Sequence, residues 1–114
     1  MASLLPRELF YQIDMKEISA QAYLKKKESG EHIILIDVRE EWEALESNIG
    51  GKCYPLGELP NYLVELERFK QTEIIVHCKS GDRSKRAQKY LTKQGFEKVF
   101  TLVGGIQAVQ ELVS

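Results

Sequence analysis

What this 114-residue chain lacks sets the first limits on its function. It holds only two cysteines, which make no disulfide framework, and its two histidines, His32 and His77, are too few and too isolated for a metal site. Its longest uninterrupted apolar run, Ile33 to Ile36, is far short of the roughly 20 residues that cross a bilayer. Met1 to Phe10 does not match a secretory signal. We therefore predict a cytoplasmic protein with no metal site, no other cofactor and no membrane contact.

The chain also has no excess of positive or negative charge. The 16 Lys and Arg nearly balance the 17 Asp and Glu, and the net charge is −1. Such a chain has no global basic field to attract nucleic acid or an anionic membrane surface. It contains no P-loop, no glycine-rich dinucleotide motif, no CxxC pair and no internal repeat. Its length fits one domain that buries roughly two-thirds of the surface of the unfolded chain.

What is present is an alternation of apolar strand-like runs with helical patterns. This order predicts a single α/β domain with a mostly parallel central sheet of about five strands, flanked by helices. We assign residues 13–114 to the domain and residues 1–12 to an N-terminal extension or linker. Strands are expected at 13–15, 33–38, 52–55, 73–77 and 98–103, and helices at 19–30, 40–46, 59–69, 84–94 and 106–113.

The stretch from His77 to Ser84 joins the end of a buried strand, a short polar loop and the start of a helix. A cysteine at this junction, Cys78, would face the loop N–H groups and the unpaired donors of the helix, which favour an anion. Arg83, Lys85 and Arg86 add positive charge, and such a setting favours a thiolate. Cys78 is therefore a candidate nucleophile. The alternative is a buried, inert cysteine.

The same loop resembles a known family. Cys78-Lys79-Ser80-Gly81-Asp82-Arg83-Ser84 is similar to the active-site loop of rhodanese-type sulfurtransferases. Three further stretches resemble that family in the same order: Ile36-Asp37-Val38-Arg39-Glu40-Glu41-Trp42-Glu43, then Asn48 to Gly51 with Tyr54 to Leu59, then Leu102 to Ile106. Together the four motifs cover about Ile18 to Val113. The resemblance implies that Cys78 carries sulfur as a persulfide. The loop that would bind the substrate consists of Lys79, Ser80, Gly81, Asp82, Arg83 and Ser84.

Loop length separates two chemistries. The resemblance implies six residues from Cys to Arg in rhodaneses and seven in dual-specificity phosphatases, and this chain has six, from Cys78 to Arg83. A tighter ring of N–H groups suits a terminal sulfur better than a tetrahedral phosphate. Sulfur transfer is favoured. A small cysteine-dependent phosphatase or arsenate reductase and a catalytically silent rhodanese-like binding module stay as alternatives.

Asp37 and Arg39 follow a buried strand at the end where α/β sheets place their sites. We expect Asp37 to act as a support that accepts hydrogen bonds from the loop or from an arginine. Arg39 is expected to pair with Glu43 at helical spacing. An alternative is that Glu41 or Glu43 orients Arg83 across the mouth of the site.

The other cysteine and the histidine beside the loop have weaker claims to function. Cys53 lies in a short strand without a glycine-rich turn or adjacent cations, which is typical of a core residue. A Cys53–Cys78 bridge is disfavoured, because a persulfide-forming thiol needs a reducing compartment. His77 precedes Cys78 on a strand and should point to the opposite face, so it is a poor general base.

The resemblance also implies partners. The donor would be a small anion such as thiosulfate or a protein persulfide. Asn48-Ile49-Gly50-Gly51, followed by Pro55 to Leu59, is similar to rhodanese domains fused behind E1-like adenylyltransferases of molybdopterin and thiamine sulfur relays. In that setting the acceptor is a ubiquitin-like sulfur-carrier protein. Asn48 and Gly50 stand where many family members have His and Pro, and Val109 stands where many have Trp. These differences affect the pocket rim and local packing rather than the loop.

Overall fold

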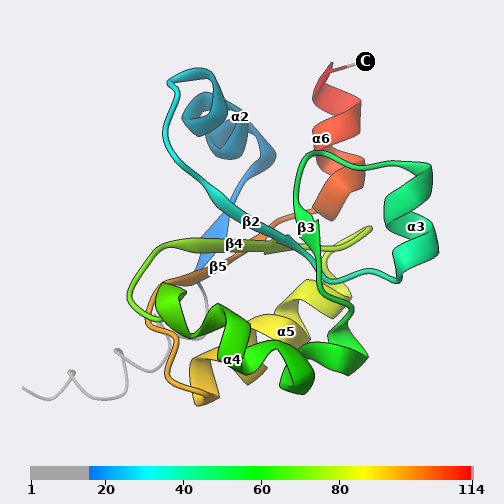
Figure 1. Cartoon of the computed structure of the whole chain (residues 1–114). Helices are drawn as coiled ribbons and strands as arrows, with labels where there is room; N and C mark the ends of the chain where they lie inside the picture. The colour runs from blue at the N-terminus through cyan, green and yellow to red at the C-terminus, as the bar shows by residue number, and fades with distance from the viewer. Residues whose placement is uncertain (1–15, 114) are drawn as a thin grey trace, which may run out of the picture.

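A computed structural model describes residues 16–113 of the chain. The predicted extension at 1–12 and the strand expected at 13–15 lie outside these residues. Within them, parallel strands form one five-stranded sheet in the order β1-β5-β4-β2-β3 (Figure 1). The strands are β1 (Glu17–Ile18), β2 (Ile34–Asp37), β3 (Lys52–Cys53), β4 (Ile74–His77) and β5 (Val99–Leu102). The predicted α/β fold with a central parallel sheet is confirmed.

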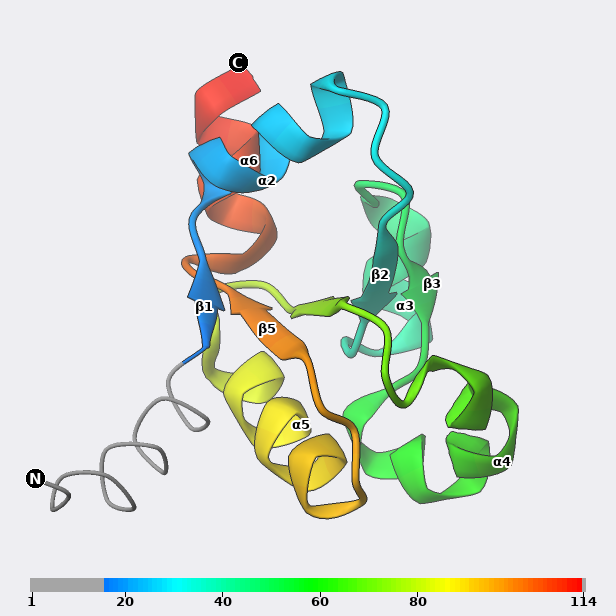
Figure 2. The same cartoon turned by 90° about the vertical axis from the view of Figure 1, so that its left-hand side faces the viewer.

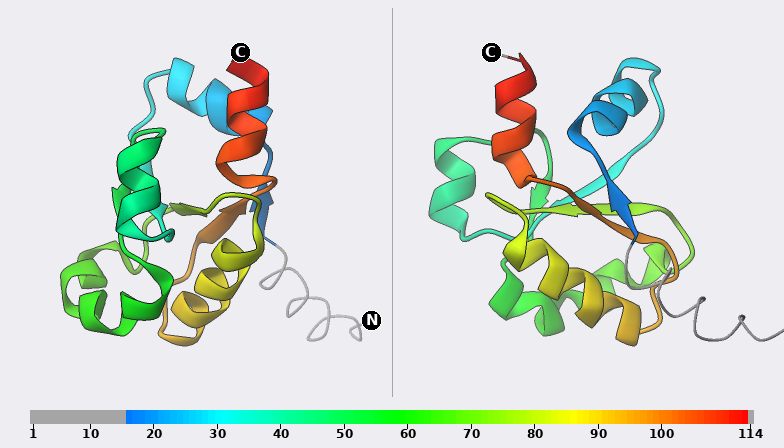
Figure 3. Two further views of the ribbon diagram at one scale, coloured as in Figure 1. Left: turned by 90° about the vertical axis from the view of Figure 1, so that its right-hand side faces the viewer. Right: turned by 180° about the vertical axis from the view of Figure 1, so that it is seen from behind.

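Helices cover both faces of this sheet. The α-helices are α2 (Ala20–Glu28), α3 (Glu41–Glu46), α4 (Leu63–Leu66), α5 (Asp82–Lys93) and α6 (Gly105–Val113). Helices α2 and α6 lie on one face, and α4 and α5 lie on the other (Figures 2 and 3). Helix α3 lies to one side, beyond the carboxyl ends of the central strands (Figure 1). None of the helices in the described range is long and apolar enough to cross a membrane.

The central strand, β4, is buried along its whole length, which explains its continuous apolar run. Its residues alternate between two cores. Ile74 and Val76 pack with Leu91 of α5, whereas Ile75 packs with Tyr23 of α2. Burial on both faces fixes the end of the strand, and with it the position of the residue that follows.

One predicted helix differs in form. The pattern at 59–69 predicts a single α-helix with Pro60 at its first position, but the segment folds as 3₁₀-helix η2 (Leu56–Tyr62), α4 and 3₁₀-helix η3 (Glu67–Phe69). Pro60 lies inside η2, where it has no N–H to give to an α-helical ladder. The packing is nevertheless as expected, because Leu59 and Leu66 are both buried in the core beside α5.

The helix ends follow their sequence signals more closely. The Ser19 hydroxyl accepts the Ala22 N–H at 3.0 Å and caps α2. Helix α5 begins two residues before the predicted Ser84 and ends before Gly95, whose φ of +97° needs glycine. The Phe96 N–H then donates to the Leu91 carbonyl at 3.1 Å, which closes the helix.

Candidate active site

Cys78 is held between β4 and the start of α6. It follows the last residue of β4, and only 1% of its surface is exposed. Two N–H groups from the first turn of α6 bind the adjoining carbonyls: Ile106 donates to Cys78 at 2.9 Å, and Gln107 donates to Lys79 at 3.2 Å. The backbone around the cysteine is therefore anchored by two elements far apart in sequence.

The loop wraps its backbone around the sulfur. The N–H groups of Gly81 and Ser84 donate to the Sγ of Cys78 at 3.1 and 3.3 Å. Gly81 has a φ of +120°, a conformation that a residue with a side chain rarely adopts. Two N–H dipoles thus converge on one point, an arrangement that backbone anion-binding sites share. This is the environment that the sequence suggests for Cys78.

The side chains of the loop divide into two groups. Lys79, Ser80 and Asp82 are exposed, and the N–H groups that bind the sulfur come from the buried Gly81 and Ser84. Ser84 is buried, and its hydroxyl donates to the Gly81 carbonyl at 3.0 Å and lies 2.6 Å from the hydroxyl of Thr101 on β5. This pair of hydroxyls ties the loop to the neighbouring strand.

Asp37 and Arg39 form a buried ion pair at the end of β2. The Asp37 carboxylate, which is fully buried, accepts hydrogen bonds from the Arg39 backbone N–H, Nε and Nη2 at 2.8–3.0 Å. These bonds raise the pKa of Arg39. Arg39 Nη2 also donates to the Ser47 carbonyl at 2.6 Å. The predicted Arg39–Glu43 pair is wrong, because Arg39 binds the fully buried Asp37 carboxylate, which would be costly to leave without a partner.

Glu43 instead binds Arg83 across the mouth of the site. Nη1 and Nη2 of Arg83 donate to the two Glu43 oxygens at 2.6 and 2.9 Å. Glu43 also accepts the Glu40 N–H at 3.0 Å, within the capping box that starts α3. Hydrogen bonds from Arg83 lower the pKa of Glu43 to about 2. Of the two sequence alternatives for Glu43, the structure has the one in which it orients Arg83.

Because of the Glu43–Arg83 pair, we expect part of the unfolding free energy to be lost in acid. The pKa of Glu43 is about 2 in the folded protein and 4.5 for an unpaired glutamate, so its contribution is complete above about pH 4.5 and is lost as the pH falls toward 2. Between about pH 5 and pH 2, we expect wild type to lose about 2–3 kcal/mol more unfolding free energy than Glu43→Gln. Urea unfolding at each pH measures this difference, and equal acid sensitivity of both proteins would contradict it.

The second cysteine and the neighbouring histidine do not contact the sulfur. Cys53 is half-buried with its Sγ 3.3 Å from the Arg39 carbonyl oxygen, and burial raises its pKa to about 11. Both cysteines are free thiols. His77 is fully buried, its Nε2 lies 3.9 Å from Asp37, and burial lowers its pKa, so it stays neutral at neutral pH. Among the described residues, its Nε2 is the one buried side-chain N or O atom without a hydrogen-bond partner.

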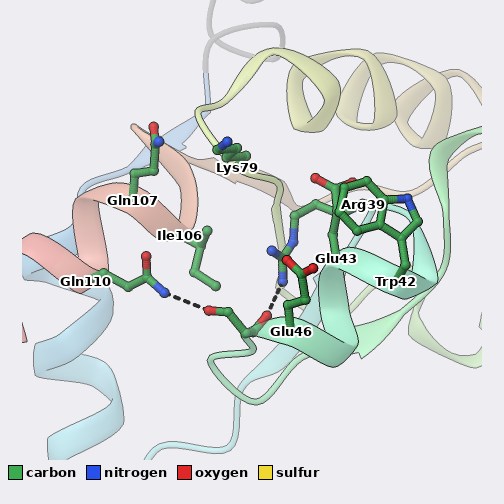
Figure 4. A pocket seen from close by; sticks show the side chains of 9 residues that line it. Arg39, Trp42, Glu43, Glu46, Lys79, Ile106, Gln107 and Gln110 are labelled. Atoms are coloured by element: carbon green, nitrogen blue, oxygen red, sulfur yellow. Dashed lines mark hydrogen bonds between the residues drawn. The ribbon is translucent and has the colours of Figure 1, made fainter.

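A pocket of about 250 Å³ opens beside Lys79, the neighbour of Cys78. Figure 4 shows that α3 forms one wall and α6 the other. The Gln110 amide reaches across to donate to the Ser47 hydroxyl at 2.7 Å. The lining residues are Arg39, Trp42, Glu43, Glu46, Ser47, Lys79, Ile106, Gln107 and Gln110. A molecule that approached the loop through this pocket would meet both charged and apolar side chains.

The family model for the rhodanese-like domain matches residues 19–112, which include strands β2 to β5, the cysteine loop and the residues that line the pocket. The chain belongs to the rhodanese-like domain family. The resemblance seen in the four sequence motifs is thereby confirmed.

Relatives of this rhodanese-like domain include two proteins of Bacillus subtilis strain 168. YtwF, provisionally named a sulfurtransferase, is 38% identical over 97 residues, which cover 84% of this chain and 91% of YtwF. YrkF, provisionally named a sulfur carrier protein, is 39% identical over 92 residues, which cover 80% of this chain but 49% of YrkF. The chain thus spans about half of YrkF. A rhodanese-related crystal structure from Thermoplasma volcanium has a TM-score of 0.72 at 26% identity, and the match covers 85% of this chain and 92% of that one.

For several residues, nothing in the sequence indicates that they belong to the site. Thr101 contacts Ser84 across 17 positions, and Gln110 contacts Ser47 across 63. Serine, threonine and glutamine are common on strands and helices, so only the assembled sheet reveals these contacts. Trp42 stands in a motif that the resemblance includes, but its place in the pocket wall depends on how α3 faces α6.

Proposed function

We propose that this rhodanese-like domain is a sulfurtransferase that carries sulfur as a persulfide on Cys78. The observation that carries the proposal is the convergence of the Gly81 and Ser84 N–H groups on the Cys78 sulfur. A buried cysteine that only filled space would not need two backbone donors. The naming of YtwF as a sulfurtransferase supports the same chemistry.

The proposed reaction has two steps. In the first, the Cys78 thiolate attacks the outer sulfur of a donor. A bond forms between Sγ and that sulfur, the bond within the donor breaks, and the leaving group takes the electron pair as sulfite or as a thiolate. In the second, an acceptor nucleophile takes the terminal sulfur and Cys78 returns as a thiolate. N–H groups of the loop from Lys79 to Ser84 would stabilise the terminal sulfur as an anion.

Donor and acceptor are proposed by class. The donor is a small anion such as thiosulfate or a protein persulfide. The acceptor is a nucleophile, and a ubiquitin-like sulfur-carrier protein or an associated adenylyltransferase is a candidate. We propose that the reaction takes place in the cytoplasm, where the Cys78 and Cys53 thiols, both free here, stay reduced.

Mass analysis of the intact protein tests this function. After incubation with thiosulfate, we expect a gain of one sulfur atom on Cys78 that cyanide removes as thiocyanate. Failure to gain sulfur from thiosulfate and from a persulfidated cysteine desulfurase would support the silent binding module instead. Hydrolysis of an aryl phosphate, which we do not expect from a six-residue loop, would support a phosphatase.

A further inference from the structure

The charges that surround the pocket cancel one another. Its charged lining residues are two cations, Arg39 and Lys79, and two carboxylates, Glu43 and Glu46. The two arginines beside the loop are already neutralised, since Arg39 binds Asp37 at 2.8 Å and Arg83 binds Glu43 at 2.6 Å. Lys79 is exposed and forms no ion pair within residues 16–113. Lys79 and Glu46, the pocket charges outside these two pairs, are opposite in sign, so the pocket itself offers a dianion little net positive charge. The exposed cations Lys85 and Arg86 of α5 lie outside its lining.

Arg83 is the cation that a donor bound in the loop would meet, because it lies inside the loop. Both of its terminal nitrogens are bound by Glu43, whose side chain is 13% exposed against 29% for Arg83. A doubly charged donor that approached Arg83 would either displace this carboxylate or lie next to it. Displacement breaks two charge-assisted hydrogen bonds, and proximity brings like charges together.

We propose that Glu43 determines donor specificity. By neutralising Arg83, it selects against small dianions such as thiosulfate and favours sulfur donors of lower charge, the class that includes a persulfide on a protein cysteine. The inference rests on the proposed sulfur transfer through Cys78. Glu43 acts on the donor through Arg83, so it is a positioning and specificity residue rather than a catalytic one.

Two small donors that differ by one charge separate this effect from reactivity. Thiosulfate, a dianion, gives its outer sulfur to the Cys78 thiolate and leaves as sulfite. Methanethiosulfonate, a monoanion, gives its outer sulfur in the same way and leaves as methanesulfinate. In each reaction the sulfur–sulfur bond of the donor breaks, its electron pair goes to the leaving group, and no further oxidant or reductant is needed.

The experiment measures the second-order rate of persulfide formation on Cys78 by intact mass, with each donor at low ionic strength. Glu43→Gln frees Arg83, and we expect the rate to rise about tenfold with thiosulfate and about threefold with methanethiosulfonate, because the attraction scales with donor charge. Added salt should reduce both effects. The matched control, Glu41→Gln on the exposed side of α3, should change either rate less than about twofold.

A double-mutant cycle with Arg83→Met distinguishes charge from structure. Arg83→Met leaves Glu43 unpaired, and the ratio of the thiosulfate rate to the methanethiosulfonate rate should fall. The double variant Glu43→Gln with Arg83→Met restores neutrality and should return that ratio to near the wild-type value. Should Glu43→Gln not fold, Arg83→Met still tests the direction of the change.

Two outcomes overturn different claims. If all three variants keep the wild-type ratio, or lose both rates equally, Glu43 does not select the donor and the pair is only structural. If wild-type protein forms no persulfide with either donor or with a protein persulfide, the proposed sulfur transfer itself fails. If both donors form the persulfide but the ratio of their rates is the same in all variants, donor selection by Glu43 is rejected and the proposed sulfur transfer stands.

Discussion

Replacement of Cys78 by serine is expected to abolish sulfur transfer and to leave the domain folded. A serine hydroxyl occupies nearly the same space and can accept the N–H groups of Gly81 and Ser84. It cannot form a persulfide, and it is not ionised at neutral pH. We expect no sulfur adduct by intact mass, turnover at least about 10³-fold below wild type, and an unfolding free energy within about 1–2 kcal/mol of wild type.

Cys53→Ser is the matched control. Its sulfur lies beside the Arg39 carbonyl, and its raised pKa of about 11 keeps it a protonated thiol at neutral pH. Sulfur loading in this variant should equal that of wild type. Turnover that survives in Cys78→Ser but is lost in Cys53→Ser would move the nucleophile to β3 and reject the assignment of the loop.

The parts of the site that could be predicted from the sequence are those formed by consecutive residues. From Cys78 to Ser84, one short segment supplies both the sulfur and its N–H donors, so the motif alone indicates their arrangement. The resemblance to the family added the order of the other motifs. The pocket could not be predicted in this way, because its walls are α3 and α6 and their separation depends on the whole sheet.

The partner of Arg39 shows why local spacing can mislead. Helical spacing predicts a contact with Glu43 only if both residues lie in the same helix, and α3 begins at Glu41, after Arg39. Arg39 therefore turns back to the buried Asp37, and Glu43 binds Arg83, 40 positions away. A similar limit applies to the segment at 59–69, where the apolar spacing indicated burial correctly but Pro60 decided the type of helix.

Replacement of Gly105 by alanine is expected to have the largest effect on stability. Gly105 begins α6 with a φ of +62°, and an added Cβ would lie 2.5 Å from the Cys78 carbonyl oxygen and closer still to that of Lys79. Neither backbone oxygen can move without shifting the loop. We expect the unfolding free energy, measured by urea unfolding, to fall by about 3–5 kcal/mol, from overpacking together with backbone strain.

The same substitution should impair the chemistry beyond its effect on stability. To relieve the clash, α6 must move from the loop, and this lengthens the hydrogen bonds from Ile106 and Gln107 to the carbonyls of Cys78 and Lys79. We therefore expect slower sulfur loading even at temperatures where Gly105→Ala is fully folded. Gly57→Ala is the control, because its added Cβ meets nothing within 4 Å and its backbone needs no glycine. If Gly105→Ala matched this control in stability and loading rate, the contact with α6 would not set the position of the loop.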